Sequence, residues 1–150
     1  MGLRVYVAGV YSRNIDGSQA GTIDTLKNIR AGQKACLDLW RDGFTPFCPW
    51  LDYQFMLLDD GEISVDMFKQ YSMDWLEVSD AVVVLSGTGI GGGVDAEINR
   101  ALALDIPLYV MVYNDYGQFL RLAPTFDSVN ETDRWRAIRS LIAYANKLHW

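Results

Sequence analysis

Short apolar runs alternate with amphipathic segments along this chain, and the alternation predicts its secondary structure. Short β-branched runs are typical of buried strands, whereas apolar residues that recur about every three or four positions are typical of helices. The predicted strands cover residues 3–9, 44–49, 81–86 and 106–113. The predicted helices cover residues 24–43 and 65–78, a segment ending near Leu104, and a closing segment from about residue 132.

Strands separated by helices indicate a parallel sheet with helices on both of its faces. We therefore expect an α/β fold, specifically a doubly wound, Rossmann-like or flavodoxin-like sheet. The length of 150 residues and the hydrophobic fraction of 50% suit one core, so a single domain over residues 1–150 is expected. Ligands of such sheets bind beyond the carboxyl ends of the strands.

Charge and composition narrow the classes of partner. The net charge of −6 argues against a nucleic-acid polymer, because binding its backbone requires many Lys and Arg side chains. The chain enters a strand pattern without a charged leader or a long apolar run, so we expect a cytoplasmic protein with no membrane partner. Cys36 and Cys48 lack metal-binding spacing and His149 is isolated, so no metal site is expected and the thiols are interpreted as structural.

A Gly-rich turn follows the third predicted strand, and Asp95 and Glu97 come directly after it, in the expected first turn of a helix. Such turns normally favour an anion, because free N–H groups and the helix dipole point at it. One interpretation is a dinucleotide site of the G-x-G-x-x-G type. Its residues would be Gly87, Gly89, Gly92 and the ribose ligand Asp115. Another is a flexible linker before a solvated acidic helix start.

The carboxylates fit a third interpretation, which is cleavage of a glycosidic bond. The transition state resembles an oxocarbenium ion, and a carboxylate held against the anomeric carbon stabilises that cation or traps it covalently. Glu97 suits this position. The glycines would let a sugar or its 5′-phosphate approach backbone N–H groups, and helix-end donors are expected to keep the carboxylate ionised.

Four segments together resemble the nucleoside 2-deoxyribosyltransferase superfamily, which includes deoxynucleoside 5′-monophosphate N-glycosidases and related phage proteins. The segments are "VYVAGVYS", "NIRAGQKACLDLWRDGFTPFCP", "WLEVSDAVVVLSG" and "GVDAEINRALALDIPLYV". The resemblance covers roughly residues 3–112. It implies a nucleoside or nucleotide substrate, no metal or organic cofactor, and a homo-oligomer in which neighbouring subunits complete the site.

The resemblance also implies roles for particular residues. Glu97, in "GVDAEINRA", corresponds to the nucleophile that attacks C1′ of the sugar, and Tyr6 to the first-strand Tyr beside it. A phosphate would be held by the turn glycines Gly89, Gly91, Gly92 and Gly93. Further candidates for substrate contact are Gly9, Tyr11, Trp50 and Asp95. Trp50 either stacks on a base or packs in the core, and Tyr11 either lines the sugar pocket or is an exposed loop aromatic.

The sequence departs from the family pattern at the second acid. The family commonly has an Asp eight residues before the Asp that opens the third strand, and here that position is Ser72. Helical periodicity places Ser72 near the centre of an inward stripe and Asp74 on the opposite, solvated face. The stripe comprises Val65, Phe68, Trp75 and Leu76. Asp95 or a residue from another subunit would have to replace the missing acid.

A second departure concerns Gly91, which stands where transferases of the family often have an Asp. The prediction is therefore an enzyme that hydrolyses or transfers an N-glycosidic bond through Glu97, with Tyr6 and Ser72 beside it. The alternative is a non-catalytic domain that binds or senses a nucleotide. A dinucleotide-binding oxidoreductase module is the third hypothesis.

Overall fold

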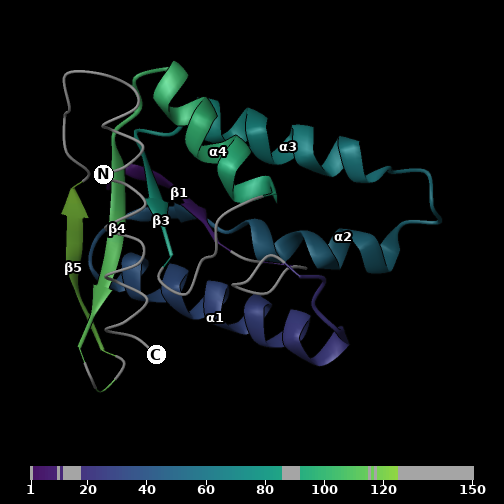
Figure 1. Ribbon diagram of the computed structural model, residues 1–150, viewed down its shortest axis with the longest axis horizontal. Helices are drawn as coiled ribbons and strands as arrows, with labels where there is room; N and C mark the ends of the chain where they lie inside the picture. The colour runs from purple at the N-terminus through teal and green to yellow at the C-terminus, as the bar shows by residue number, and fades with distance from the viewer. Residues whose placement is uncertain are drawn as a thin grey trace.

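A computed structural model describes residues 2–9, 11, 18–85, 92–114, 116 and 118–124 (Figure 1). The elements in chain order are β1 (Arg4–Ala8), α1 (Thr22–Arg41), β2 (Thr45–Phe47), the 3-10 helix η1 (Pro49–Leu51), α2 (Asp52–Leu58), α3 (Val65–Glu77), β3 (Ala81–Val84), α4 (Gly92–Ala103), β4 (Leu108–Tyr113) and β5 (Phe119–Pro124). The closing helix predicted from about residue 132 lies outside the described residues.

The described strands form one five-stranded sheet in the order β2-β1-β3-β4-β5. The pairs β1–β2, β1–β3 and β3–β4 are parallel, which confirms the predicted α/β class with its mostly parallel sheet. β5 is antiparallel to β4 and was not predicted from the sequence. A tight connection explains its direction: the Asn114 side chain accepts hydrogen bonds from the N–H groups of Tyr116 and Gln118, which reverses the chain.

Helices pack on both faces of the sheet, because side chains alternate along each strand. On β1, Val5 and Val7 join a core with buried residues of α1, including Ile29 and Leu39. Tyr6 and Ala8 point the other way. They join a second core, which is formed with α3, α4 and the neighbouring strands and contains Leu76, Val94, Ile98 and Ala101. Figure 1 shows α1 on one side of the strands, and α3 with α4 on the other.

Arg4 and Asp80 join the beginnings of β1 and β3. The Asp80 carboxylate accepts a hydrogen bond from the Arg4 backbone N–H at 2.8 Å and forms a 3.3 Å ion pair with its guanidinium. The Asp80 N–H in turn donates to the Arg4 carbonyl at 2.8 Å. These bonds lower the pKa of Asp80, the backbone bond contributing most. Asp80 therefore braces the sheet at the edge opposite the carboxyl ends of the parallel strands.

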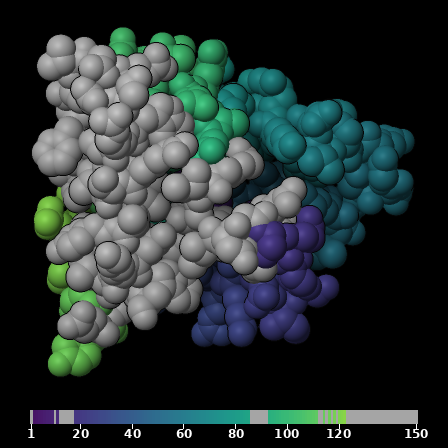
Figure 2. Space-filling view, viewed as in Figure 1, coloured from purple at the N-terminus to yellow at the C-terminus, as the bar shows by residue number. Residues whose placement is uncertain are grey.

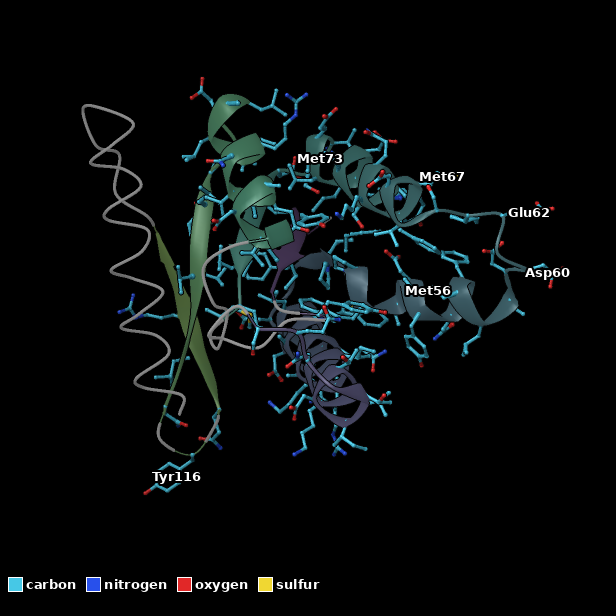
Figure 3. The ribbon with its side chains drawn as sticks, turned by 45° about the vertical axis from the view of Figure 1, so that its right-hand side comes forward. Met56, Asp60, Glu62, Met67, Met73 and Tyr116 are labelled. Atoms are coloured by element: carbon cyan, nitrogen blue, oxygen red, sulfur yellow. The ribbon has the colours of Figure 1, made fainter. Side chains whose placement is uncertain are left out.

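The segment after β2, where the sequence pattern predicted neither a helix nor a strand, is helical. The short helices η1 and α2 lead away from the sheet, and α3 returns beside α2, with the Phe55 and Tyr71 rings in edge contact at 6.1 Å. The connection is ordered by Asp59, whose carboxylate accepts from the N–H groups of Gly61 and Ile63. Figure 3 places Asp60 and Glu62 at the outer end of this helix pair. In the space-filling view α3 projects to the right of the sheet (Figure 2).

Two local features favour the starts of the helices η1 and α3. Pro49 at the start of η1 fixes a backbone angle compatible with a helical turn, and Ser64 caps α3 by accepting from the Met67 N–H. No helix in the described part of the chain combines the length and hydropathy needed to cross a bilayer.

Candidate active site

Tyr6 and Glu97 meet where the sheet faces α4. The Tyr6 hydroxyl donates a 2.7 Å hydrogen bond to Oε1 of Glu97. The Tyr6 side chain is fully buried, and its ring stacks on Phe47 of the neighbouring strand, with the ring centroids 5.6 Å apart. The structure therefore brings together the two residues that the sequence paired and fixes the direction of the phenol.

The position of Glu97 within α4 differs from the expectation. Because the helix already begins at Gly92, Asp95 lies in its first turn and Glu97 lies in the second. Glu97 is adjacent to Ile98 and one turn from Val94 and Ala101, all of which are buried against the sheet. The carboxyl group is thus half-buried at the margin of the packed face and reaches the strand below.

Burial decides the protonation of this pair. It raises the pKa of Glu97 from the usual 4.5 to about 7, against the smaller effect of the Tyr6 hydrogen bond, which lowers it. Loss of hydration thus outweighs the donor, so burial opposes the ionised state that helix-end donors were expected to maintain. Burial and the charge of Glu97 both raise the pKa of Tyr6, so the phenol keeps its proton and acts as the donor.

Ser72 lies on the inner side of α3, as its place on the helix predicted. It is half-buried, and its hydroxyl donates to Oδ2 of Asp52 at 3.3 Å. A hydrogen bond with Ser72 also lowers the pKa of Tyr6, against the stronger effect of burial, so the hydroxyl also lies beside the phenol. Asp74 is exposed, which confirms its predicted place on the solvated face of the helix. Its carboxylate accepts a 2.8 Å hydrogen bond from the Gln70 side chain.

The predicted inward stripe of α3 is only partly correct. Leu76 is buried and Phe68 is half-buried, but Val65 and Trp75 are exposed. Trp75 nevertheless packs against the sheet, because its ring stacks on Phe47 of β2 with centroids 5.4 Å apart. The helix α2 lies beside the middle of α3, where Phe55 contacts Tyr71 and Asp52 contacts Ser72. Ser72 therefore faces a neighbouring helix.

Asp52 is the site residue that sequence reasoning missed. It is the first residue of α2 and is only 7% exposed. Among the described residues, no other charged residue is as deeply buried. Burial raises its pKa, and the Ser72 hydrogen bond opposes that rise. An acidic residue at a helix start is ordinarily solvated, so only its position directly after the second strand, at the sheet edge where ligands bind, could have indicated a role.

Four side chains from four elements thus form one group, which we call the polar chain: Asp52, Ser72, Tyr6 and Glu97. Hydrogen bonds join Asp52 to Ser72 and Tyr6 to Glu97, and the pKa of Tyr6 responds to both Ser72 and Asp52. Two carboxyl groups linked through two hydroxyls can hold and move protons, and a carboxylate in such a setting can also attack an electron-poor carbon.

Tyr11 lies close to this polar chain. It is half-buried and packs against the core on the α1 side of the sheet, and whether it lines a sugar pocket stays a prediction. Its pKa is raised by burial, then by the charge of Asp52 and by Tyr53, and its buried hydroxyl has no hydrogen-bond partner among the described residues. The Asn28 side chain holds its backbone by donating to the Tyr11 carbonyl at 3.0 Å. Tyr11 therefore places near Asp52 a hydroxyl that has no partner within the described ranges.

Trp50 belongs to the core, which corrects its assignment to substrate contact. It is 1% exposed and packs with Val7 and Leu39 on the α1 side of the sheet. Its indole lies directly on Gly32, where a Cβ would overlap the ring. The ring is therefore enclosed by protein atoms and cannot stack on a nucleobase.

Gly9 is also explained by packing around Trp50. A Cβ there would lie 2.8 Å from the Trp50 ring and 3.0 Å from Leu85 Cβ. The glycine therefore accommodates core side chains, and its contact with a substrate stays a prediction. Cys36 and Cys48 of the same core are free thiols, with Cys36 buried and Cys48 half-buried.

The remaining candidates lie in and after the Gly-rich turn. Gly89 and Gly91 fall outside the described residues, as do Gly87 and Asp115 of the dinucleotide pattern. Gly92 and Gly93 open α4, and a Cβ at Gly93 would meet nothing within 4 Å. Asp95 is half-buried one turn before Ile98. Within the described ranges, no three His, Cys, Asp or Glu side chains gather closely enough to hold a metal ion.

Comparison with known proteins places the chain in a family without assigning an activity. No curated protein matches it. One family model matches residues 4–111, a span that runs from β1 into β4 and contains every member of the polar chain. The chain therefore belongs to the family described as a domain of unknown function, DUF7768.

Proposed function

We propose that this protein cleaves the N-glycosidic bond of a nucleoside or nucleoside 5′-monophosphate, by hydrolysis or by transfer to another base. The observation that carries the proposal is the 2.7 Å hydrogen bond from the buried Tyr6 phenol to Glu97. It holds a carboxyl group at the margin of the sheet, directly after the Gly-rich segment. Membership of the nucleoside 2-deoxyribosyltransferase superfamily and a doubly wound sheet are part of the same proposal, supported by the sequence resemblance and by helices on both sheet faces.

In the proposed reaction Glu97 attacks C1′ of the sugar as a carboxylate. The C1′–N bond breaks, its electron pair leaves with the base, and a glycosyl ester forms on Glu97. Water then releases the sugar, or an acceptor base takes it. The raised pKa of Tyr6 suits a group that donates to the Glu97 carboxyl and orients it throughout. The reaction requires no metal or organic cofactor.

The proposed partners follow from charge and from exposed surface. A nucleoside or nucleotide fits better than a nucleic-acid polymer because the net charge is −6. A homo-oligomer, dimer or higher, is proposed because large apolar side chains are exposed on α2 and α3. They include Phe55, Leu57, Leu58, Val65 and Trp75. A cytoplasmic location and the absence of a membrane partner stay predictions from the sequence.

A non-catalytic nucleotide-binding domain is the second candidate. Ser72 stands in the place of the family's acid, and a Glu97 pKa of about 7 leaves a substantial fraction of the carboxyl protonated at neutral pH. Both features reduce the reactivity expected of a nucleophile without removing a binding site.

The test is incubation with a panel of nucleosides and 5′-monophosphates, with and without an acceptor base, followed by chromatography of the free base. We expect base release by the wild type and none by Glu97→Ala, with unchanged circular dichroism. The matched control is Glu62→Gln, at the outer end of the α2–α3 pair (Figure 3), which is expected to retain activity.

Each alternative has its own outcome in this experiment. Unchanged turnover in Glu97→Ala would refute the nucleophile. A nucleotide that raises the melting temperature without any base release would favour the binding domain. Tight binding of NADH, seen by fluorescence, would support the dinucleotide hypothesis.

A further inference from the structure

We propose that Asp52, acting through the hydroxyl of Ser72, is the acid that protonates the departing base. The inference rests on the proposed function and extends it, because it names a second proton-transferring group that lies on a different helix from the nucleophile. Breaking a C1′–N bond places an electron pair on a base nitrogen, so an acid close to the nucleophile lowers the barrier. Asp52 is not the residue that the family pattern would select.

The geometry singles out Asp52. Asp52 is buried, and none of the ion pairs among the described residues involves it. Its carboxyl group accepts a 3.3 Å hydrogen bond from the Ser72 hydroxyl. Burial without a counter-charge favours the neutral, protonated acid. A neutral carboxyl group is what proton donation requires.

The neighbouring titratable groups are poorer donors. Burial, the largest cause in both cases, raises the pKa values of Tyr6 and Tyr11, so both phenols hold their protons more firmly than usual. Cys48 packs against the core on the α1 side of the sheet, whereas Tyr6 belongs to the core on the other face. Glu97, the remaining acid of the polar chain, is occupied by the attack on C1′. Asp52 is therefore the available acid.

Ser72 connects the buried acid to the accessible part of the site. It is half-buried and hydrogen-bonded to Asp52, which is 7% exposed, so Ser72 is the more accessible residue of the two. With Asp52 protonated, its O–H donates to Ser72 Oγ, and the Ser72 proton is free to pass to a nitrogen of the base. The position that lacks an acid thus still carries the atom that delivers the proton.

The step balances within the site. As the C1′–O bond to Glu97 forms and the C1′–N bond breaks, the base nitrogen receives the Ser72 proton, and Ser72 receives the proton of Asp52. In hydrolysis, water then attacks C1′ and its proton returns through Ser72 to the Asp52 carboxylate. The C1′–O bond to Glu97 breaks, and both acids recover their starting states.

The test compares two substrates that differ only in their need for an acid. One is the nucleotide that the wild type cleaves fastest, and the other is its analogue with a ring N-methylated base, which leaves without accepting a proton. For Asp52→Asn and Ser72→Ala we expect kcat on the natural nucleotide to fall by about 100-fold or more. On the methylated analogue it should fall by less than about fivefold. The control is Asp74→Asn, an exposed carboxylate on the same helix as Ser72, which is expected to match the wild type on both substrates.

A second experiment exchanges the carboxyl group of Asp52 with the hydroxyl group of Ser72. Asp52→Ser with Ser72→Asp moves the acid from α2 to α3, and it should recover at least tenfold of the activity that Asp52→Ser alone loses, in keeping with the contribution of a positioned acid. If Asp52→Asn fails to fold, Ser72→Ala and this exchange still give the two readouts.

Equal losses on both substrates, or no loss on either, would overturn the role of Asp52 while base release by the wild type leaves the proposed function standing. If the wild type releases base from neither substrate, the proposed function itself fails, and the role of Asp52 fails with it.

Discussion

The Tyr6 phenol lies 2.7 Å from the Glu97 carboxyl, although 91 positions separate the two residues along the chain. Tyr6 belongs to β1, and Glu97 belongs to α4, the helix that follows β3. Their contact places a protonated donor against an acid whose pKa is about 7. It therefore couples the protonation of the site to the stability of the fold and, in the proposed reaction, to activity.

Tyr6→Phe should shift the pH dependence of activity. In the proposed reaction Glu97 attacks only when ionised, and the Tyr6 hydrogen bond lowers the pKa of that carboxyl. A hydrogen bond to a charged group contributes about 1.5–3 kcal/mol, so its removal should move the acid limb of kcat/KM to higher pH by about one pH unit or more. The profile between pH 5 and 9 is the measurement, and an unmoved limb would show that Tyr6 does not tune Glu97.

Glu97→Gln should stabilise the fold at high pH. The folded pKa of about 7 lies above the usual 4.5, so the stability gained from the protonated carboxyl is fully present below pH 4.5 and is lost as pH rises through about 7. The neutral amide avoids that loss, which corresponds to roughly 3 kcal/mol at most. Urea unfolding at pH 5 and pH 8 should show a variant close to the wild type at the lower pH and more stable at the higher. A pH-independent difference would contradict the burial of this carboxyl.

Gly32→Ala should destabilise the protein through Trp50. The added methyl would overlap the indole, and overpacking of a core typically costs about 1–3 kcal/mol. Gly93→Ala is the matched control, because a Cβ there meets nothing within 4 Å and alanine favours the helix by up to about 1 kcal/mol. Thermal unfolding of the two variants should move in opposite directions. Equal melting temperatures would mean that Trp50 is not held against α1.

Self-association should be visible in sedimentation equilibrium, with a mass of at least twice 16.9 kDa. Leu58 and Trp75 are exposed on the α2–α3 pair, so replacing Leu58 with Glu should weaken the assembly if these helices form the contact. An active monomer would contradict the proposed oligomer.

Much of the fold could be predicted from local pattern. The runs at 81–86 and 106–113 are too apolar for an exposed surface, and the spacing within 24–43 and 65–78 suits one-sided helices. The structure confirms strands and helices at these places, with ends that differ by a few residues. Prediction from hydrophobic pattern failed for two short elements. The helix α2 has only seven residues, most of which are exposed, and the direction of β5 depends on a turn formed by the Asn114 side chain.

The candidate site divides in the same way. The sequence alone determined the strand that carries Tyr6, the helix that carries Glu97 and the inward position of Ser72, because each follows from periodicity or from a resemblance in consecutive residues. Tertiary structure decided what those residues contact. Asp52 becomes a buried acid only because α2 and α3 lie side by side, and Trp50 is core only because Gly32 leaves room for its ring. Hydrophobic pattern records which side of an element is buried, whereas burial of a charge and its pKa depend on atoms contributed by distant elements.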